Sequence, residues 1–302
     1  MTFEAVDQSA PGQDSARPSA DIHAFFDEAT NSVSYLVSDP ASGAAAIIDP
    51  VLGFDPVSGR VDSEGAERIL KLAMDRGLTV DWILETHAHA DHLSAADHLR
   101  RRTGAKLAVG AGIRHVQEEF GRRLDARDIA PDGGDFDRLL DDRDRLPLGQ
   151  LEIEVLSTPG HTPACVSYRV GDAVFVGDTM FMPDYGTARC DFPGGDAGQL
   201  YRSMHRILAL PRETRLFMCH DYPPAGREPR WEVTVAEQRA ANIHIRDGVS
   251  EEEFVAMRTS RDATLQMPVL ILPAIQVNLS AGHLPQAEDN GVRYLKIPLN
   301  AL

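Results

Sequence analysis

The chain has 302 residues, of which 43% are hydrophobic, and this is enough to bury a sizeable core. Lysine and arginine total 30 against 46 aspartates and glutamates, which gives a formal net charge of -16. A surface this acidic repels nucleic acid and anionic membranes, so we exclude both as partners. The three cysteines form no CxxC pair, which argues against a disulfide scaffold and favours the reducing cytoplasm.

The two ends of the chain differ in composition from the middle. Residues 1–20 are rich in Ser, Ala, Pro and Asp and contain no apolar run of the signal-peptide type, so we expect a mobile tail there. The apolar stretch Met267–Ile275 contains two prolines and is too short to span a bilayer. We therefore expect one catalytic domain over residues 21–302, which includes a C-terminal helical extension.

The first half of the chain reads as strands followed by helices. Three strand-like runs are separated by polar and glycine turns: Ile22–Phe26, Val33–Val37 and Ala44–Ile48. Apolar residues at helical spacing over 66–74 predict a helix that stops at Gly77. The apolar, β-branched run Val80–Leu84 predicts a buried strand, and Leu93–Leu99 then predicts a helix.

The second half of the chain shows the same pattern of predicted strands and helices. Strands are expected at Leu151–Leu156, Cys165–Val170, Ala173–Val176 and Thr214–Met218, with a hairpin turn at Gly171-Asp172. Helices are expected at Tyr201–Leu208, Val233–Ile243 and Ser250–Met257. Hairpins at the start of each half argue against a purely parallel sheet. The pattern predicts an α/β (α+β) fold in which two sheets lie between helices, an αββα layering.

The segment directly after the strand Val80–Leu84 concentrates metal-binding side chains. It reads His87-Ala88-His89-Ala90-Asp91-His92. Side chains two apart at the end of a strand point the same way, so His87 and His89 can share one ion, while Asp91 and His92 can face a neighbouring position. Imidazole combined with carboxylate suits zinc, iron or manganese better than calcium.

Three more candidate ligands each lie just past a predicted strand. His161 follows the strand that ends at Leu156, Asp178 follows the second hairpin, and His220 follows the strand that ends at Met218. Loops that follow strands gather at one edge of a sheet, so we expect these side chains to join the histidine segment in one metal site.

These segments resemble the signature of the metallo-β-lactamase superfamily. The order is Thr-His-Ala-His-Ala-Asp-His at 86–92, Pro-Gly-His-Thr at 159–162, Gly-Asp at 177–178 and the later His220. The resemblance spans residues 20–245 and implies the αββα sandwich with its metal site at the sheet edge.

Within that superfamily the chain looks most like the persulfide dioxygenases, in the branch of bacterial β-lactamase-like hydrolase proteins. The segments that carry this resemblance are 47–51, 159–165, 182–192, 219–222 and 234–238. The Arg-Thr-Asp that is usual in the family reads Arg189-Cys190-Asp191 here. The identity of the thiol carrier, glutathione or another such as coenzyme A, therefore stays open.

The resemblance implies one ferrous ion per chain, held by His87, His161 and Asp178. It leaves His89, Asp91, His92 and His220 as residues that orient these ligands or hold a second metal. We expect Arg189, Cys190 and Tyr222 to contact the substrate. Arg189 is equally compatible with a surface salt bridge, and Cys190 with core packing.

The implied reaction is oxidation of glutathione persulfide, or a related small persulfide, by O2 to sulfite and free thiol. The first alternative is a glyoxalase-type thioester hydrolase with two Zn2+ per chain, in which Asp178 bridges the ions. One ion then takes His87, His89 and His161, and the other takes Asp91, His92 and His220. The second alternative is a sulfide-responsive binding protein without catalysis. The oligomeric state stays open, with a homodimer as one option.

Overall fold

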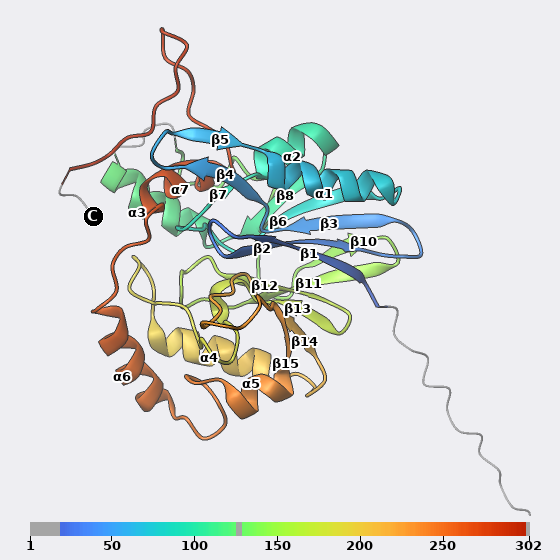
Figure 1. Cartoon of the computed structure of the whole chain (residues 1–302), viewed down its shortest axis with the longest axis vertical. Coiled ribbons are helices and arrows are strands. Elements are labelled where there is room, and N and C mark those ends of the chain that lie inside the picture. The colour runs from blue at the N-terminus through green and yellow to red at the C-terminus, as the bar shows by residue number, and fades with distance from the viewer. Residues whose placement is uncertain (1–18, 125–128, 300–302) are drawn as a thin grey trace, which may run out of the picture.

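The computed structural model describes residues 19–124 and 129–299. Two six-stranded sheets lie face to face, and helices cover the outer face of each (Figure 1). The αββα layering predicted from the sequence is therefore confirmed. The expected tail over residues 1–20 lies almost wholly outside the described residues.

The first sheet is built from the first half of the chain. Its strand order is β1-β2-β3-β6-β8-β9, antiparallel from β1 to β3 and parallel from β3 to β9. The strands are β1 (Asp21–Asp27), β2 (Ser32–Ser38), β3 (Ala44–Ile48), β6 (Thr79–Glu85), β8 (Lys106–Gly110) and β9 (Arg138–Leu140). A small sheet, β5-β4-β7, lies beside it and comprises β4 (Val51–Asp55), β5 (Arg60–Asp62) and β7 (Leu93–Ser94).

Four helices cover the outer face of this sheet: α1 (Glu64–Asp75), α2 (Ala96–Thr103), α3 (Ile113–Leu124) and α7 (Ile271–Asn278). Helix α1 shows why they dock. Its buried residues Ala66, Ile69, Leu70 and Ala73 recur at helical spacing and form one apolar face against the sheet. Helix α7 comes from the far end of the chain, so the C-terminal segment returns to pack on the first half.

The second sheet has the order β10-β11-β12-β13-β14-β15. Its strands are β10 (Arg145–Leu148), β11 (Leu151–Ser157), β12 (Val166–Val170), β13 (Ala173–Phe175), β14 (Arg215–Phe217) and β15 (Glu232–Thr234). Its outer face is covered by α4 (Ala197–Leu208), α5 (Val235–Ala241) and α6 (Glu251–Asp262). Each of the three helices begins at a side-chain cap, from Asp196, Thr234 and Ser250 respectively.

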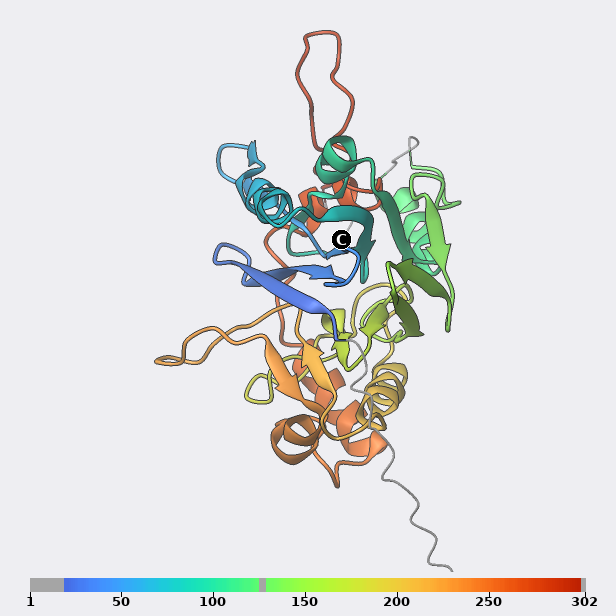
Figure 2. The same ribbon diagram turned by 90° about the vertical axis from the view of Figure 1, so that its right-hand side faces the viewer.

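An aromatic cluster fills the space between the two sheets, which Figure 2 shows one above the other. Tyr35 lies with its ring centre 5.0 Å from that of Phe175 and 5.6 Å from that of Phe217. At one edge the sheets also join through their backbones, because Val33 N–H donates to Cys219 C=O and Val166 N–H donates to Thr86 C=O. The predicted metal-binding segments meet at this edge.

Some predicted elements differ in extent from those observed. The helix predicted from Leu93 begins at Ala96, because Leu93–Ser94 pairs with β4 as a short strand. The predicted elements do not include helices α3 and α7 or the strands β4, β5, β8, β9, β10 and β15, and the helix predicted from Val233 begins after β15, at Val235. None of the helices within residues 19–124 and 129–299 has the length and apolar character that a bilayer-spanning helix needs.

Candidate metal centre

The structure brings all seven predicted metal-site residues to the edge where the sheets join. His87, His89, Asp91 and His92 lie on the loop between β6 and β7. The other three come from the second sheet. His161 follows β11, Asp178 lies in the 3-10 turn Gly177–Thr179 after β13, and His220 follows β14.

His87, His161 and Asp178 form one buried group whose ligand atoms all lie within 4.8 Å of one another. Asp178 Oδ2 is 3.7 Å from His87 Nε2 and 3.5 Å from His161 Nε2. The second ring nitrogen of each histidine has its own partner. His161 Nδ1 donates to Arg189 C=O at 2.7 Å, and His87 Nδ1 lies 3.0 Å from Thr86 Oγ1. Both Nε2 atoms are therefore directed at the carboxylate of Asp178.

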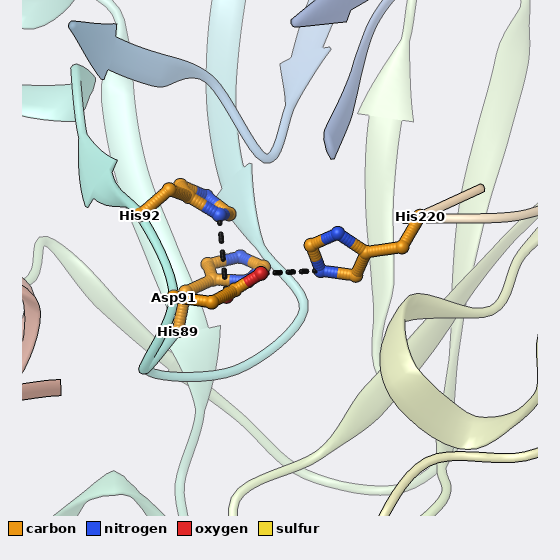
Figure 3. Close-up of side chains that lie close together, drawn as sticks. All are labelled: His89, Asp91, His92 and His220. Carbon is orange, nitrogen blue, oxygen red and sulfur yellow. Dashed lines mark ion pairs between the residues drawn. The ribbon is translucent and has the colours of Figure 1, made fainter. Parts of the chain in front are cut away.

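His89, Asp91, His92 and His220 form a second group beside the first. Figure 3 shows His220 reaching across to Asp91 from the opposite ribbon, with His92 and His89 on the same loop as Asp91. Asp91 Oδ2 is 3.3 Å from His220 Nε2, and Asp91 Oδ1 is 3.5 Å from His92 Nδ1. His220 Nε2 also lies 3.3 Å from Asp178 Oδ1, so the two groups share Asp178 as a neighbour.

Unpartnered polar atoms test whether these residues fit a metal. Six buried side-chain atoms at the site make no hydrogen bond: His87 Nε2, His89 Nδ1, Asp91 Oδ2, His92 Nε2, Asp178 Oδ1 and His220 Nε2. Buried polar atoms without partners are rare, because each loses its contacts with water and gains nothing in return. Imidazole nitrogens and carboxylate oxygens are the ligands of first-row transition metals, so the donor set fits such an ion.

A layer of hydrogen bonds behind the histidines fixes their orientation. Asp49, directly after β3, accepts from Thr86 N–H at 2.7 Å and lies 3.1 Å from His89 Nε2. Ser32 Oγ lies 3.1 Å from His92 Nδ1 and 3.3 Å from His220 Nδ1. Contacts of this kind set which ring nitrogen is free to bind a metal. Sequence reasoning assigned no role to Asp49 or Ser32.

Burial and charge shift the pKa values of the buried histidines in opposite directions. Burial, together with the neighbouring imidazoles, lowers the pKa of His87 well below its usual value and also lowers that of His92. Burial acts in the same direction on His220, but Asp91, Cys219 and Asp178 together outweigh it and raise the His220 pKa well above its usual value. Neutral His87 is in the protonation state that metal coordination requires.

A cleft of about 590 Å3 opens onto the metal centre. Asp91, His161 and Asp178 lie at its inner end. Its walls are largely apolar and aromatic and include Phe54, Phe181, Tyr185, Ala188, Phe192, Leu265 and Leu270. The size and lining are those of a site for a small organic molecule. Its C-terminal wall is formed by residues 258–270.

Of the three residues predicted to contact substrate, two line this cleft. Tyr222 lies with its ring parallel to that of His220, at a centroid distance of 5.7 Å. Arg189 also lines the cleft, but its nitrogens are engaged. Nε and Nη2 pair with the Asp191 carboxylate, and Nη1 donates to Gln266 C=O at 2.6 Å.

Cys190 does not line the cleft. Its side chain is 8% exposed and packs in the core beneath helix α4. Burial raises the pKa of its thiol, so it is held neutral. The geometry therefore offers a packing role for Cys190 in place of the predicted substrate contact.

The fold and the paired histidine–carboxylate groups define a metal-dependent enzyme, and comparison with known proteins identifies its family. The sequence model described as "Metallo-beta-lactamase superfamily" matches residues 28–220. The chain belongs to the metallo-β-lactamase superfamily. The resemblance seen in the sequence is thus confirmed, and metal binding by the His/Asp cluster follows from membership.

Named relatives fall into two groups. A "Probable metallo-hydrolase" of Burkholderia pseudomallei is 55% identical over 292 residues, which cover 93% of this chain and 99% of the relative. A "Beta-lactamase hydrolase-like protein" of Agrobacterium fabrum is 54% identical over 93% of this chain, but the chain spans only 65% of that protein's length. The mitochondrial "Persulfide dioxygenase ETHE1" of Bos taurus is 29% identical over 86% of this chain and 88% of its own length.

Among solved structures, that of ETHE1 from Myxococcus xanthus is similar to this chain with a TM-score of 0.70 and 32% identity. The alignment covers 87% of this chain and all of the Myxococcus chain. The relatives thus bear names of both hydrolases and dioxygenases, and the reaction has to be argued from the site.

Proposed function

We propose that this protein is a persulfide dioxygenase with one Fe2+ per chain, held by His87, His161 and Asp178. The observation that carries the proposal is the composition of the first group, two imidazoles and one carboxylate with mutually close ligand atoms. This donor set is typical of non-haem iron oxygenases, which keep further coordination positions open. Similarity to the ETHE1 structure over 87% of the chain supports the same assignment.

The overall reaction converts a glutathione persulfide, or a related small persulfide, to the thiol: GSSH + O2 + H2O → GSH + SO3(2-) + 2H+. The sulfane sulfur is oxidised, dioxygen is reduced, and the S–S bond breaks so that one sulfur leaves as sulfite. Bound ferrous iron supplies the redox chemistry with dioxygen.

The cleft residues bind and orient the substrate. Phe192 packs its ring at 79° to that of His161, at a centroid distance of 5.3 Å, and together with Phe181 it limits water at the inner end of the cleft. Tyr222 lines the cleft, and its hydroxyl makes no hydrogen bond to any residue within 19–124 or 129–299. It is therefore available to donate to a substrate held beside Asp178.

Arg189 contributes to substrate binding by holding the cleft wall. Its bond to Gln266 C=O fixes the segment 265–270, and its guanidinium lies 5.0 Å from the ring centre of Phe192. The two guanidinium N–H groups that make none of these bonds are left for a carboxylate of the thiol carrier.

A binuclear hydrolase is the second candidate, and the second group favours it. Asp91 Oδ2, His92 Nε2 and His220 Nε2 are buried and make no hydrogen bond, as expected of ligands for another ion. Such an enzyme carries two Zn2+ per chain and uses them to activate water for attack on a thioester. The similarity to a probable metallo-hydrolase supports this reading.

One set of measurements separates the two candidates. Protein purified without oxygen and loaded with Fe2+ is placed in an oxygen electrode and given glutathione persulfide, glutathione alone or S-lactoylglutathione. The dioxygenase takes up O2 and forms sulfite with the persulfide only. Hydrolysis of S-lactoylglutathione without O2 uptake, by protein that binds two metals per chain, refutes the proposal. If O2 is taken up only with coenzyme A persulfide, the thiol carrier is coenzyme A instead of glutathione, and the proposed oxidation of a persulfide still holds.

A further inference from the structure

The last residue of helix α7 makes three hydrogen bonds to the loop that carries the histidines. Asn278 is 5% exposed. Its Nδ2 donates to both His89 C=O and His92 C=O at 2.8 Å, and its Oδ1 accepts from Ser94 N–H at 2.8 Å. One side-chain amide thus satisfies three buried backbone groups, two carbonyls of the loop and the N–H of Ser94 in the short strand β7.

The two carbonyl groups belong to residues of the second metal group. Fixing the carbonyls of His89 and His92 fixes the backbone on both sides of Asp91, and with it the directions of three candidate ligands. The same network continues through Ser94, whose hydroxyl donates to Glu85. The free oxygen of Glu85 lies 3.4 Å from His89 Nε2. The Asn278 amide therefore holds the His89 backbone directly and is linked to the His89 ring through Ser94 and Glu85.

Helix α7 is itself held firmly against this part of the fold. Gln117 of α3 donates to Leu279 C=O at 2.9 Å, just past the end of α7. Gly282 lies so close to the start of α2 that an added Cβ would be 3.0 Å from Asp97 N. A fixed helix gives the Asn278 amide a defined position, whereas a loosely packed helix would not.

We propose that Asn278 is a positioning residue of the metal centre, holding the loop 89–94 in the conformation that binds metal. The C-terminal helix α7 lies outside residues 28–220, which the superfamily model matches, so the proposed positioning residue comes from beyond the segment that identifies the family. The inference concerns metal binding and holds for either candidate reaction.

The test compares metal affinity in variants of the same helix. Metal-free full-length protein is titrated with Co2+, and binding is followed by the visible absorption of the ion. Removing a partner behind metal ligands typically costs about 10–100-fold in affinity, so Asn278→Ala should raise the Co2+ dissociation constant by about that factor and alter the absorption spectrum. Gln276→Ala is the matched control. Its amide bonds Lys296 and Leu272, away from the metal loop, so its dissociation constant should stay within about twofold of wild type.

The melting temperature of each metal-free variant separates positioning from general stability. A lower melting temperature in Asn278→Ala with a Co2+ dissociation constant and spectrum like those of wild type overturns the proposal. If Asn278→Ala fails to fold, the same titration is done with Asn278→Leu, because leucine fills the same space and removes the same three hydrogen bonds. Wild-type affinity in the leucine variant likewise overturns the proposal, and weakened affinity supports it.

Discussion

Replacing Arg258 by methionine should destabilise the protein by about 3–5 kcal/mol, the usual cost of breaking a buried ion pair from one side. Arg258 is 1% exposed and lies against Asp262, which is 5% exposed. Its Nε is 2.8 Å from Asp262 Oδ1, and its Nη1 donates to Thr187 C=O at 3.1 Å. Methionine fills much of the space but leaves the Asp262 carboxylate buried with one remaining donor, the backbone N–H of Cys190.

The loss is measured by urea unfolding of metal-free protein, because a bound ion would add its own stabilisation. A loss of this size corresponds to a fall in melting temperature of roughly 6–20 °C. The double variant Arg258→Met/Asp262→Asn should recover about 1–3 kcal/mol, since asparagine removes the uncompensated charge and keeps an acceptor for Cys190 N–H. Arg261→Met is the control, because Arg261 is exposed on the same helix and its loss should cost about 0.5 kcal/mol or less.

The double variant decides whether the reasoning is right. If the buried charge causes the loss, the double variant is more stable than Arg258→Met alone. A double variant that is equally or less stable, or a loss below about 1 kcal/mol in the single variant, contradicts the argument.

His161→Ala should lose nearly all bound metal, because the site then keeps too few protein ligands; full iron retention, measured by elemental analysis, refutes the assignment. Asp91→Ala and His220→Ala should each keep most of one iron per chain but change turnover, whereas loss of a second stoichiometric metal supports the hydrolase. Burial and then Arg258 lower the pKa of His244 to about 4, from a usual 6.5. Stability from neutral His244 is therefore complete above about pH 6.5 and is lost as the pH falls through about 4. The urea midpoint should depend less on pH in His244→Asn, and an unchanged dependence argues against this origin.

The sequence was most informative where a local pattern coincides with a topological rule. Val80–Leu84 reads as a buried strand, and residues that follow strands meet at one sheet edge, so the proximity of His161, Asp178 and His220 to the histidine loop could be expected. Asp49 follows β3 in the same way, and the same rule applied to it would have placed it beside His89.

Other parts of the site left no local signal. Ser32 and Asn278 contact the histidine loop across 60 and about 190 positions of sequence, and a single serine or asparagine has many roles in a chain of this length. The Cys190 side chain faces the core because its backbone N–H is held by Asp262, a contact between a loop and a distant helix. Periodicity reports which face of an element is buried, but not which distant element covers it.

The ligand candidates are divided between the two sheets, and this has a consequence for the order of assembly. His87 and Asp91 belong to the first sheet, while His161, Asp178 and His220 belong to the second. A cation bound by both sets acts as a cross-link between two half-molecules, and neither half alone carries a complete set. Tight metal uptake therefore follows docking of the sheets, as a closing step of folding. At a free metal concentration 1,000 times the dissociation constant, metal binding raises the free energy of unfolding by about 4 kcal/mol. Removing the metal with a chelator should therefore first weaken the contact between the two sheets.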